Sequence, residues 1–220
     1  MMPSGESQTE REKRLAAAAA AALVEDGMTV GLGTGSTVAF LLPALAARGL
    51  ELRCVATSPA TERAAGELGI AVEPFESLDR LDIAIDGADQ VAPDGWLVKG
   101  GGGAHTREKI VAAAAERFIV IADSTKPVAR IAAPVPLELL SFGLPATLRR
   151  LGSVALRDGP ASPDGGVIAD YRAEVDDVGA LAARLEATPG VVDHGLFAPT
   201  LVSDVLVGRA DGVERIWPSD

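Results

Sequence analysis

The residues best suited to chemistry stand on either side of four consecutive glycines, residues 100–103. Lys99 precedes the run, and Glu108 follows it near the start of a helix-like stretch, 106–115. Consecutive glycines cost conformational entropy on folding, so such a run is typical of backbone that approaches a ligand closely. A carboxylate can accept a proton, and an ammonium can stabilise negative charge that develops on oxygen. The segment therefore predicts a site for a small anionic ligand whose reacting carbon needs both groups.

The plainer alternative is that Glu108 belongs to a helix cap and Lys99 to the surface. With Thr106 as the capping residue, Glu108 lies in the first turn, where the helix dipole favours an ionised carboxylate. The glycine run makes the functional interpretation the stronger one. Lys109, the next residue along the helix, is expected to point away from Glu108 into solvent.

A second glycine turn, Gly-Leu-Gly-Thr-Gly-Ser-Thr at residues 31–37, follows a strand-like run and opens an apolar helix. Its amides and the hydroxyls of Thr34, Ser36 and Thr37 suit a phosphate at a helix N-terminus. The spacing excludes a P-loop and is a poor match to a dinucleotide fingerprint. An ordinary strand-to-helix turn with Ser36 as N-cap is the alternative.

Two more polar segments follow strand-like runs. Asp86-Gly-Ala-Asp89 comes after residues 81–85, and Ile-Ala-Asp-Ser-Thr-Lys126 overlaps the end of residues 118–122. Ligands of open α/β sheets bind at the carboxyl ends of the strands, so both segments are expected in one crevice. The two aspartates could hold sugar hydroxyls or a divalent metal, or form a solvated turn. No His or Cys lies nearby in sequence, which disfavours the metal.

The elements that must position these segments alternate between strand and helix. This alternation predicts an α/β fold with a mostly parallel sheet and helices on both faces. Helices are expected over residues 10–25, 38–47, 59–68 and 106–115, and strands over residues 28–32, 52–56, 70–72, 81–85, 96–98 and 118–122.

After residue 132 the order changes to β-α-β-β-α-β, which suits a small ferredoxin-like α+β module. Its elements are expected over residues 134–139, 145–151, 153–156, 166–170, 178–186 and 190–196. A last hairpin, 202–207 and 212–216, rejoins the first sheet. We therefore predict a disordered lead-in over residues 1–9, a main catalytic domain over 10–132 plus 200–220, and a small domain over 133–199.

Composition excludes several classes of protein. The 220 residues are 48% hydrophobic and 4% aromatic, with a net charge of −11 and a pI of about 4.7. Acidity of this kind argues against nucleic-acid binding, and no basic run suggests a membrane surface. The single cysteine, Cys54, forms no intramolecular disulfide and is expected in a buried strand. Residues 15–24 are too short to cross a bilayer, so a cytoplasmic protein is expected.

Neither histidine has the spacing of a metal ligand. We interpret His105 as a loop or cap residue and His194 as an ordinary strand residue. No metal is predicted.

Taken together, the segments GLGTGST, DGAD, KGGGGAHTREK and IADSTK resemble ribose-5-phosphate isomerase, type A, in order and spacing. The ending PGVVDHGLF…DVLVG…DGVERI is similar to that family's C-terminal segment. The resemblance covers nearly all of residues 13–216. It implies an enzyme that interconverts D-ribose 5-phosphate and D-ribulose 5-phosphate through a cis-enediolate, with no cofactor, and a Rossmann-like fold of the isomerase and coenzyme A transferase type.

The resemblance also implies roles for individual residues. Glu108 matches the proton acceptor, Lys99 would stabilise the enediolate, and Asp86 and Asp89 would hold hydroxyls and assist ring opening. The remaining substrate contacts it implies are Lys13, Thr34, Gly35, Ser36, Thr37, Gly87, Ala88, Gly100, Gly101, Gly102 and Lys126. Three positions depart from the family pattern, at Gln90 (commonly Glu), Gly103 (more usually Ala) and His105 (usually apolar).

Two other classes of protein are weighed beside the isomerase. A non-catalytic sugar-phosphate-sensing domain of the same fold would be joined to a DNA-binding helix-turn-helix, which the short first helix and the acidity disfavour. A coenzyme A transferase would carry a glutamate nucleophile in a motif of its own, which is not found. Members of the family are usually dimers or tetramers, so a homodimer or homotetramer that binds a small sugar phosphate is expected.

Overall fold

The central sheet is built from strand–helix repeats, as the alternating pattern predicts. The computed structural model describes residues 6–217 and shows six strands in the order β13-β12-β6-β3-β1-β2. All neighbours are parallel except the edge strand β13, which pairs antiparallel with β12. Their bounds are β1 Thr29–Leu32, β2 Arg53–Ala56, β3 Leu81–Gly87, β6 Ala115–Ala122, β12 Asp204–Arg209 and β13 Gly212–Trp217.

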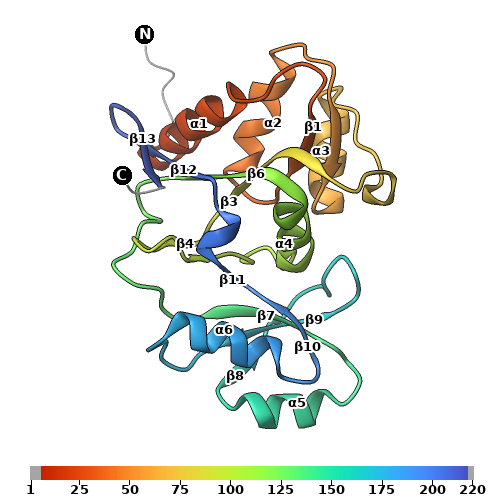
Figure 1. The fold of residues 1–220 in the computed structure, drawn as a ribbon, viewed down its shortest axis with the longest axis vertical. Helices are drawn as coiled ribbons and strands as arrows, with labels where there is room; N and C mark the ends of the chain where they lie inside the picture. Colours follow the sequence, from red (N-terminus) through yellow and green to blue (C-terminus); the bar gives the residue numbers. More distant parts are fainter. Residues whose placement is uncertain (1–5, 218–220) are drawn as a thin grey trace.

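Helices cover both faces of this sheet (Figure 1). The helices α1 (Gln8–Ala21), α2 (Val38–Ala46) and α3 (Pro59–Glu67) share one aliphatic cluster with Ile83 and Ile85 of β3. Successive side chains of a strand point to opposite faces, so Ala84 packs on the other side, with Val111. Val111 belongs to α4 (His105–Ala114). The alternation predicted from sequence is therefore confirmed.

The order of the strands changes direction between β1 and β3. From β1 the chain crosses through α2 to β2 on one side, and β3 pairs with β1 on the other side. The carboxyl ends of the two strands are in register, Leu32 opposite Ile85, so the loops that follow them lie beside each other. Ligands of open α/β sheets bind at such a switch of direction.

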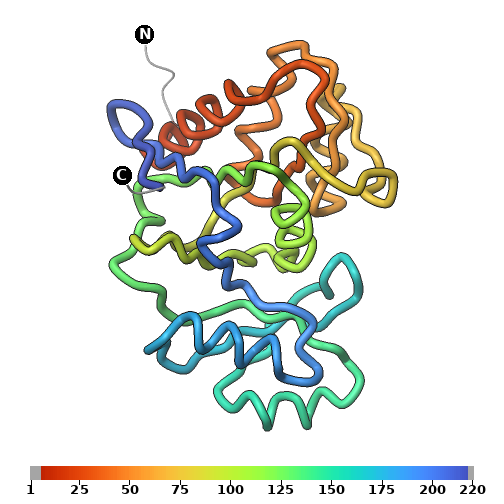
Figure 2. Tube along the Cα trace, in the orientation of Figure 1, coloured from red at the N-terminus to blue at the C-terminus, as the bar shows by residue number. Residues whose placement is uncertain are grey.

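The second part of the chain forms the predicted β-α-β-β-α-β unit. Its antiparallel sheet has the order β10-β7-β9-β8, the arrangement of a ferredoxin-like fold. Figure 2 shows the chain entering this unit after the green β6 and returning from it in blue. The bounds are β7 Val135–Leu139, α5 Leu144–Leu151, β8 Val154–Leu156, β9 Val167–Tyr171, α6 Val178–Glu186 and β10 Val191–His194.

The prediction of one strand over residues 190–196 is wrong, because Gly195 divides it. β10 ends at His194, and β11 (Leu196–Phe197) joins a different sheet, in the order β11-β5-β4, with β5 at Leu97–Val98 and β4 at Gln90–Val91. The carbonyl of Gly195 accepts the amide of Lys99 at 2.8 Å. A Cβ on Gly195 would lie 2.1 Å from the Lys99 carbonyl oxygen, so this close approach requires glycine. The break fixes the backbone of Lys99.

The first helix begins earlier than predicted. Ser7 and Glu10 form a reciprocal capping box that starts α1 at Gln8. Of the lead-in predicted over residues 1–9, residues 1–5 lie outside the described residues, whereas Gln8 and Thr9 already belong to the helix.

Three smaller features complete the comparison with the sequence. The strand predicted over 70–72 is a single bridge between Val72 and Cys54. Two short 3₁₀ helices, η1 (Phe75–Ser77) and η2 (Pro199–Leu201), were not predicted. Cys54 is buried in β2 as expected, and burial raises the pKa of its thiol to about 12. Among the helices described, none is both long and apolar enough to span a membrane.

Candidate active site

A cavity of about 200 Å³ lies at the carboxyl ends of the parallel strands and gathers most of the predicted site residues. All of them line it except Asp86, which lies beneath its wall, and Lys13, which reaches its rim through Ser36. The lining residues are Thr34, Gly35, Ser36, Thr37, Gly87, Ala88, Asp89, Lys99, Gly100, Gly101, Gly102, Glu108 and Lys126.

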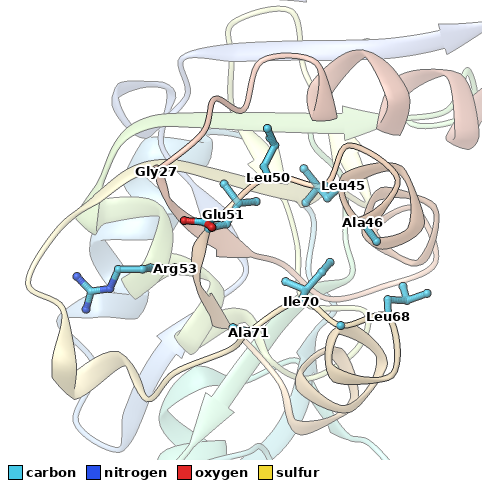
Figure 3. Close-up of a pocket in the computed structure, with 12 residues that line it drawn as sticks. Gly27, Leu45, Ala46, Leu50, Glu51, Arg53, Leu68, Ile70 and Ala71 are labelled. Carbon is cyan, nitrogen blue, oxygen red and sulfur yellow. The ribbon is translucent and has the colours of Figure 1, made fainter.

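A larger cavity of about 560 Å³ lies at the opposite end of the sheet (Figure 3). It is bounded by the ends of α2 and α3 and by the amino end of β2, and its walls are mostly aliphatic, with Leu45, Leu68 and Ile70 among them. Arg53 is already paired with Glu73 at 2.8 Å. None of the predicted site residues lines this cavity, so we place the site at the smaller one.

Three buried ionisable groups form the centre of the site. The Lys99 ammonium lies 2.9 Å from Asp86 Oδ2 and 3.2 Å from Glu108 Oε2, and it donates to the Gly87 carbonyl. All three side chains are 3–4% exposed. Burial alone would lower the pKa of Lys99, but the two carboxylates outweigh burial and raise that pKa. The ammonium therefore stays charged.

The two carboxyls differ in the support they receive. Asp86 accepts the amides of Thr34 at 3.0 Å and Gly87 at 2.7 Å besides the ammonium. Burial nevertheless raises the pKa of Asp86, against the lowering influence of Lys99. Within residues 6–217 the Glu108 carboxyl has the ammonium as its one polar partner, and burial, together with the charge of Asp86, raises its pKa to about 8. Glu108 is the group poised to exchange a proton near neutral pH.

Asp86 is held against a glycine that leaves no room for a larger residue. A Cβ on Gly33 would lie 2.0 Å from the Asp86 carboxyl carbon. We expect Gly33→Ala to push Asp86 away from Lys99 and lower kcat roughly 10- to 100-fold, since small displacements of catalytic groups are costly.

Gly66→Ala is the matched control, because a Cβ on Gly66 in α3 would meet nothing within 4 Å. It should leave kcat unchanged and stabilise the helix. Steady-state kinetics of both variants test this, and an unchanged kcat in Gly33→Ala would contradict it.

The other end of the cavity is basic. Lys13 of α1 donates to Ser36 Oγ at 2.9 Å, and Lys126 lines the same space. The alternative in which Ser36 caps α2 is wrong: the N-cap is Thr37, which makes no side-chain capping bond. The first amides of α2 are therefore uncapped by a side chain, as an anion at a helix N-terminus requires. Thr34 Oγ1 instead lies 2.7 Å from Thr57 Oγ1, which ties this loop to the end of β2.

The glycine run forms the wall between these ends. Gly100 and Gly103 have φ of +105° and +73°, the left-handed region that favours glycine. The amide of Gly101 donates to Asp89 Oδ2 at 2.9 Å, so the two predicted substrate loops hold each other. Within the part of the chain described, no group of three or more His, Cys, Asp or Glu side chains is arranged to hold a metal ion.

Three expectations for helix α4 are wrong. Thr106 does not cap it, since α4 begins at His105 after Ala104, and the Thr106 hydroxyl donates to Glu138. His105 is fully buried rather than a loop or cap residue. Lys109 is not solvated, because its ammonium pairs with Asp193 of β10. His194 is a strand residue as expected, and it is buried as well.

The two buried histidines should make the fold sensitive to acid. Burial, reinforced by the charge of Lys109, lowers the pKa of His105 to about 4 and that of His194 to about 3, from an ordinary 6.5. Because the unfolded chain binds these protons first, the stability contributed is complete above pH 6.5 and is lost as the pH falls towards 4.

We expect the melting temperature of His105→Leu to fall less between pH 7 and pH 5 than that of the parent. The comparison isolates the imidazole from Glu108, whose raised pKa acts in the opposite direction. Equal falls in the two proteins would contradict the prediction.

Three contacts that support the site were not predicted. Gln90 exchanges two hydrogen bonds with the backbone of Ala132, at 2.8 and 2.9 Å, which a carboxylate in its place could not do. Glu12, buried in α1, accepts the amide of Ser124 at 3.0 Å and so ties the loop that carries Lys126. Arg157 contacts the glycine run from the small sheet. No local pattern marks these residues, because each partner is distant in sequence.

Comparison with known sequences matches this chain to a family of enzymes. The model of the family ribose 5-phosphate isomerase A (phosphoriboisomerase A) matches residues 53–212. A ribose-5-phosphate isomerase A of Caulobacter vibrioides is 45% identical over 223 residues, which cover 94% of this chain and 98% of that protein. One of Natronomonas pharaonis is 46% identical over 220 residues, with 94% and 96% covered.

Solved structures of the same kind of enzyme superimpose closely on this chain. The crystal structure of ribose 5-phosphate isomerase A from Neisseria gonorrhoeae superimposes with a TM-score of 0.92 at 32% identity, covering 97% of this chain and 99% of the other. A D-ribose-5-phosphate isomerase in complex with phospho-erythronic acid gives a TM-score of 0.89 at 34% identity, with 95% and 99% covered.

Proposed function

We infer the roles of individual residues from one premise: the chain belongs to the ribose-5-phosphate isomerase A family. It is an aldose–ketose isomerase of the pentose phosphate pathway that interconverts D-ribose 5-phosphate and D-ribulose 5-phosphate. Nothing in the comparisons supports a non-catalytic sensor. The observation that supports the proposed roles best is the pair of Glu108 and Lys99, buried at the wall of a cavity whose other end is basic.

Glu108 is the proposed base. Its carboxylate removes the proton from C2 of the open-chain aldose, and the electron pair moves to the C1 carbonyl oxygen to give a cis-enediolate. The proton returns to C1, while the proton of the C2 hydroxyl passes to the C1 oxygen, so that C2 becomes the carbonyl. Lys99 lies where it can stabilise the enediolate oxygen, and it is already held by two carboxylates, so little reorganisation is needed.

The remaining predicted site residues bind the substrate in this proposal. Asp86 and Asp89 accept hydroxyls and assist ring opening, with Gly87, Ala88 and the glycines Gly100–102 closing the wall. The phosphate lies at residues 34–37, with Lys126 and Lys13, which reaches the site through Ser36. Binding energy at the phosphate positions the reacting carbons. A relative was solved with phospho-erythronic acid, and we expect that compound, which carries an anionic group at each end, to bind here too.

The direct test is to incubate the protein with D-ribose 5-phosphate and follow the formation of D-ribulose 5-phosphate. We propose that no metal or organic cofactor takes part, so the rate should be the same with and without a chelator. Absence of turnover would contradict the function, and loss of turnover with the chelator would contradict the proposed chemistry.

The pH dependence tests Glu108 as the base. A base acts when deprotonated, so kcat/KM should rise with pH and level off above about 8, the raised pKa of Glu108 in the free protein. The measurement is kcat/KM between pH 5.5 and 9.5, at constant ionic strength. A limb near 4.5, the ordinary value for a glutamate, would show that the base is a different or a solvated carboxyl.

We also propose that the chain forms a homodimer or homotetramer and acts in the cytoplasm. Phe142 is 92% exposed and Leu140 is 51% exposed, which is an unusual surface for a monomer. The two domains proposed are residues 10–132 plus 200–220 and residues 133–199. Native mass spectrometry tests the assembly, and a monomer at micromolar concentration would contradict it.

A further inference from the structure

One side chain of the small antiparallel unit reaches the wall of the active site. Arg157, just after β8, donates Nη1 to the carbonyl of Gly100 at 2.8 Å and to that of Gly101 at 3.1 Å. Its Nε and Nη2 pair with the carboxylate of Asp170 in β9, at 3.1 and 2.7 Å. The two side chains are only 24% and 13% exposed. A planar guanidinium is suited to this task, because it can hold carboxylate and carbonyl oxygens at once.

We propose that Arg157 is a positioning residue for the isomerisation: it draws the carbonyls of Gly100 and Gly101 out of the cavity and thereby turns the following amides into it. This inference rests on the proposed function of the site. Arg157 itself touches no reacting atom in this proposal. It acts through the backbone of the glycine run.

The geometry of the peptide bond links the two sides of the wall. In a trans peptide the carbonyl of one residue and the amide of the next point in opposite directions. The Gly100 carbonyl faces Arg157, and accordingly the Gly101 amide faces the other way and donates to Asp89. The Gly101 carbonyl also faces Arg157, so the Gly102 amide is directed the other way too, and Gly102 lines the cavity.

The Gly102 amide is a free donor. Within residues 6–217 no protein atom accepts it. A fixed donor in the wall of the cavity that Lys99 and Glu108 also line can bind an oxygen of the substrate and stabilise negative charge as it develops there. The site would then use a backbone amide as well as the ammonium for the enediolate.

The glycine run needs a contact from outside, because glycine residues do not fix the orientation of their own peptide groups. Each glycine can adopt both signs of φ at little cost, so the peptides of the run can rotate and present carbonyl oxygens to the anionic intermediate. The Gly100 carbonyl also accepts the amide of Gly103 at 3.1 Å, whereas the Gly101 carbonyl has only Arg157 as a partner within residues 6–217. Arg157 opposes this rotation by binding both carbonyls. Asp170 lies in the middle of the small sheet, paired with both β7 and β8, which makes it a rigid anchor for the guanidinium.

A purely structural role for Arg157 would be to join the two parts of the molecule. Arg107 of α4 has only that role: it forms two hydrogen bonds with Asp164 of the small unit, at 2.6 and 2.8 Å, and within residues 6–217 it donates to no glycine carbonyl. Arg107→Gln is therefore the matched control for Arg157→Gln. Both substitutions remove one arginine–aspartate pair and one arginine link between the same two parts, although the Arg157–Asp170 pair itself lies within the small unit.

The experiment measures kcat, KM, melting temperature and binding for both variants. We expect Arg157→Gln to lower kcat about 10- to 100-fold, the scale of a misplaced catalytic group. It should weaken binding of phospho-erythronic acid but leave binding of inorganic phosphate, which occupies only the other end, unchanged. Arg107→Gln should keep kcat within about twofold of the parent. An unchanged kcat in Arg157→Gln, or equal losses in both variants, would overturn the proposal.

Asp170→Asn provides a second route if Arg157→Gln does not fold. It keeps the guanidinium but loosens its anchor, so kcat should fall by less than in Arg157→Gln, with binding of inorganic phosphate again unchanged. Arg157→Lys should recover only part of the activity, because an ammonium cannot hold both carbonyls and Asp170 in one plane. A full kcat in Asp170→Asn and Arg157→Lys would overturn the proposal. Failure of the proposed function itself would appear differently, as an inactive parent protein.

Discussion

Replacing Glu108 by glutamine is expected to lower kcat by about 10² to 10⁴, the range that positioned proton transfer contributes. Glutamine has the same size and can still accept from Lys99, but it cannot take the C2 proton. The buried ammonium keeps its pair with Asp86 at 2.9 Å, so the variant should fold with a melting temperature close to that of the parent. Binding of phospho-erythronic acid should also persist, because the phosphate end of the cavity is unchanged.

The control is Glu174→Gln, which makes the same chemical change at a side chain that is 70% exposed. It should leave kcat unaltered. Steady-state kinetics and a binding titration separate the possible results for Glu108→Gln. Turnover close to that of the parent would exclude Glu108 as the base, whereas loss of both binding and folding would mean that the carboxyl supports the structure.

Much of the fold could be predicted because its signals are local. Apolar runs that end in Asp-Gly or glycine turns mark β1 and β3, an apolar run that ends in Asp-Ser-Thr marks β6, and the change to β-α-β-β-α-β after residue 132 marks the small sheet. Errors arose where a contact from another element decides the outcome. Gly195 ends β10 because the backbone of Lys99 lies against it, and residues 99 and 195 are far apart in sequence.

The candidate site, too, has features that local sequence predicts and features that depend on contacts from other elements. The four loops could be predicted because each follows its strand directly, and parallel strands bring their carboxyl ends to one edge. The sequence could not show how deeply the site residues are buried. Burial and the charge of Asp86 raise the pKa of Glu108, and both arise only from the fold. The sequence predicts a solvated Lys109 and a loop or cap position for His105, but in the fold both side chains are largely buried and Lys109 pairs with Asp193 of β10. Arg157 carries no motif, and its partners lie in a separate sheet.

Replacing Lys99 by methionine should have an effect nearly as large. Methionine keeps the length of the side chain but removes the charge, so Asp86 and Glu108 lose the ammonium that lies between them. The enediolate then has no cation beside it, and kcat should fall by about 10² to 10³, as when a charge-stabilising donor is removed from an active site. Because Lys99 lowers the pKa of Glu108, its loss should also move the limb of the pH profile to values above 8.

Stability has to be separated from catalysis, since breaking a buried ion pair costs about 3–5 kcal/mol. Lys109→Met is the control that the structure offers. Lys109 also pairs with a largely buried carboxylate, and both ammonium groups lie over the ring of Phe197, at 5.1 Å for Lys109 and 5.5 Å for Lys99. The two variants should therefore lose similar stability, but only Lys99→Met should lose kcat and shift its pH profile. Equal losses of kcat in both would mean that packing around Phe197, and not the charge at the cavity wall, is what the reaction requires.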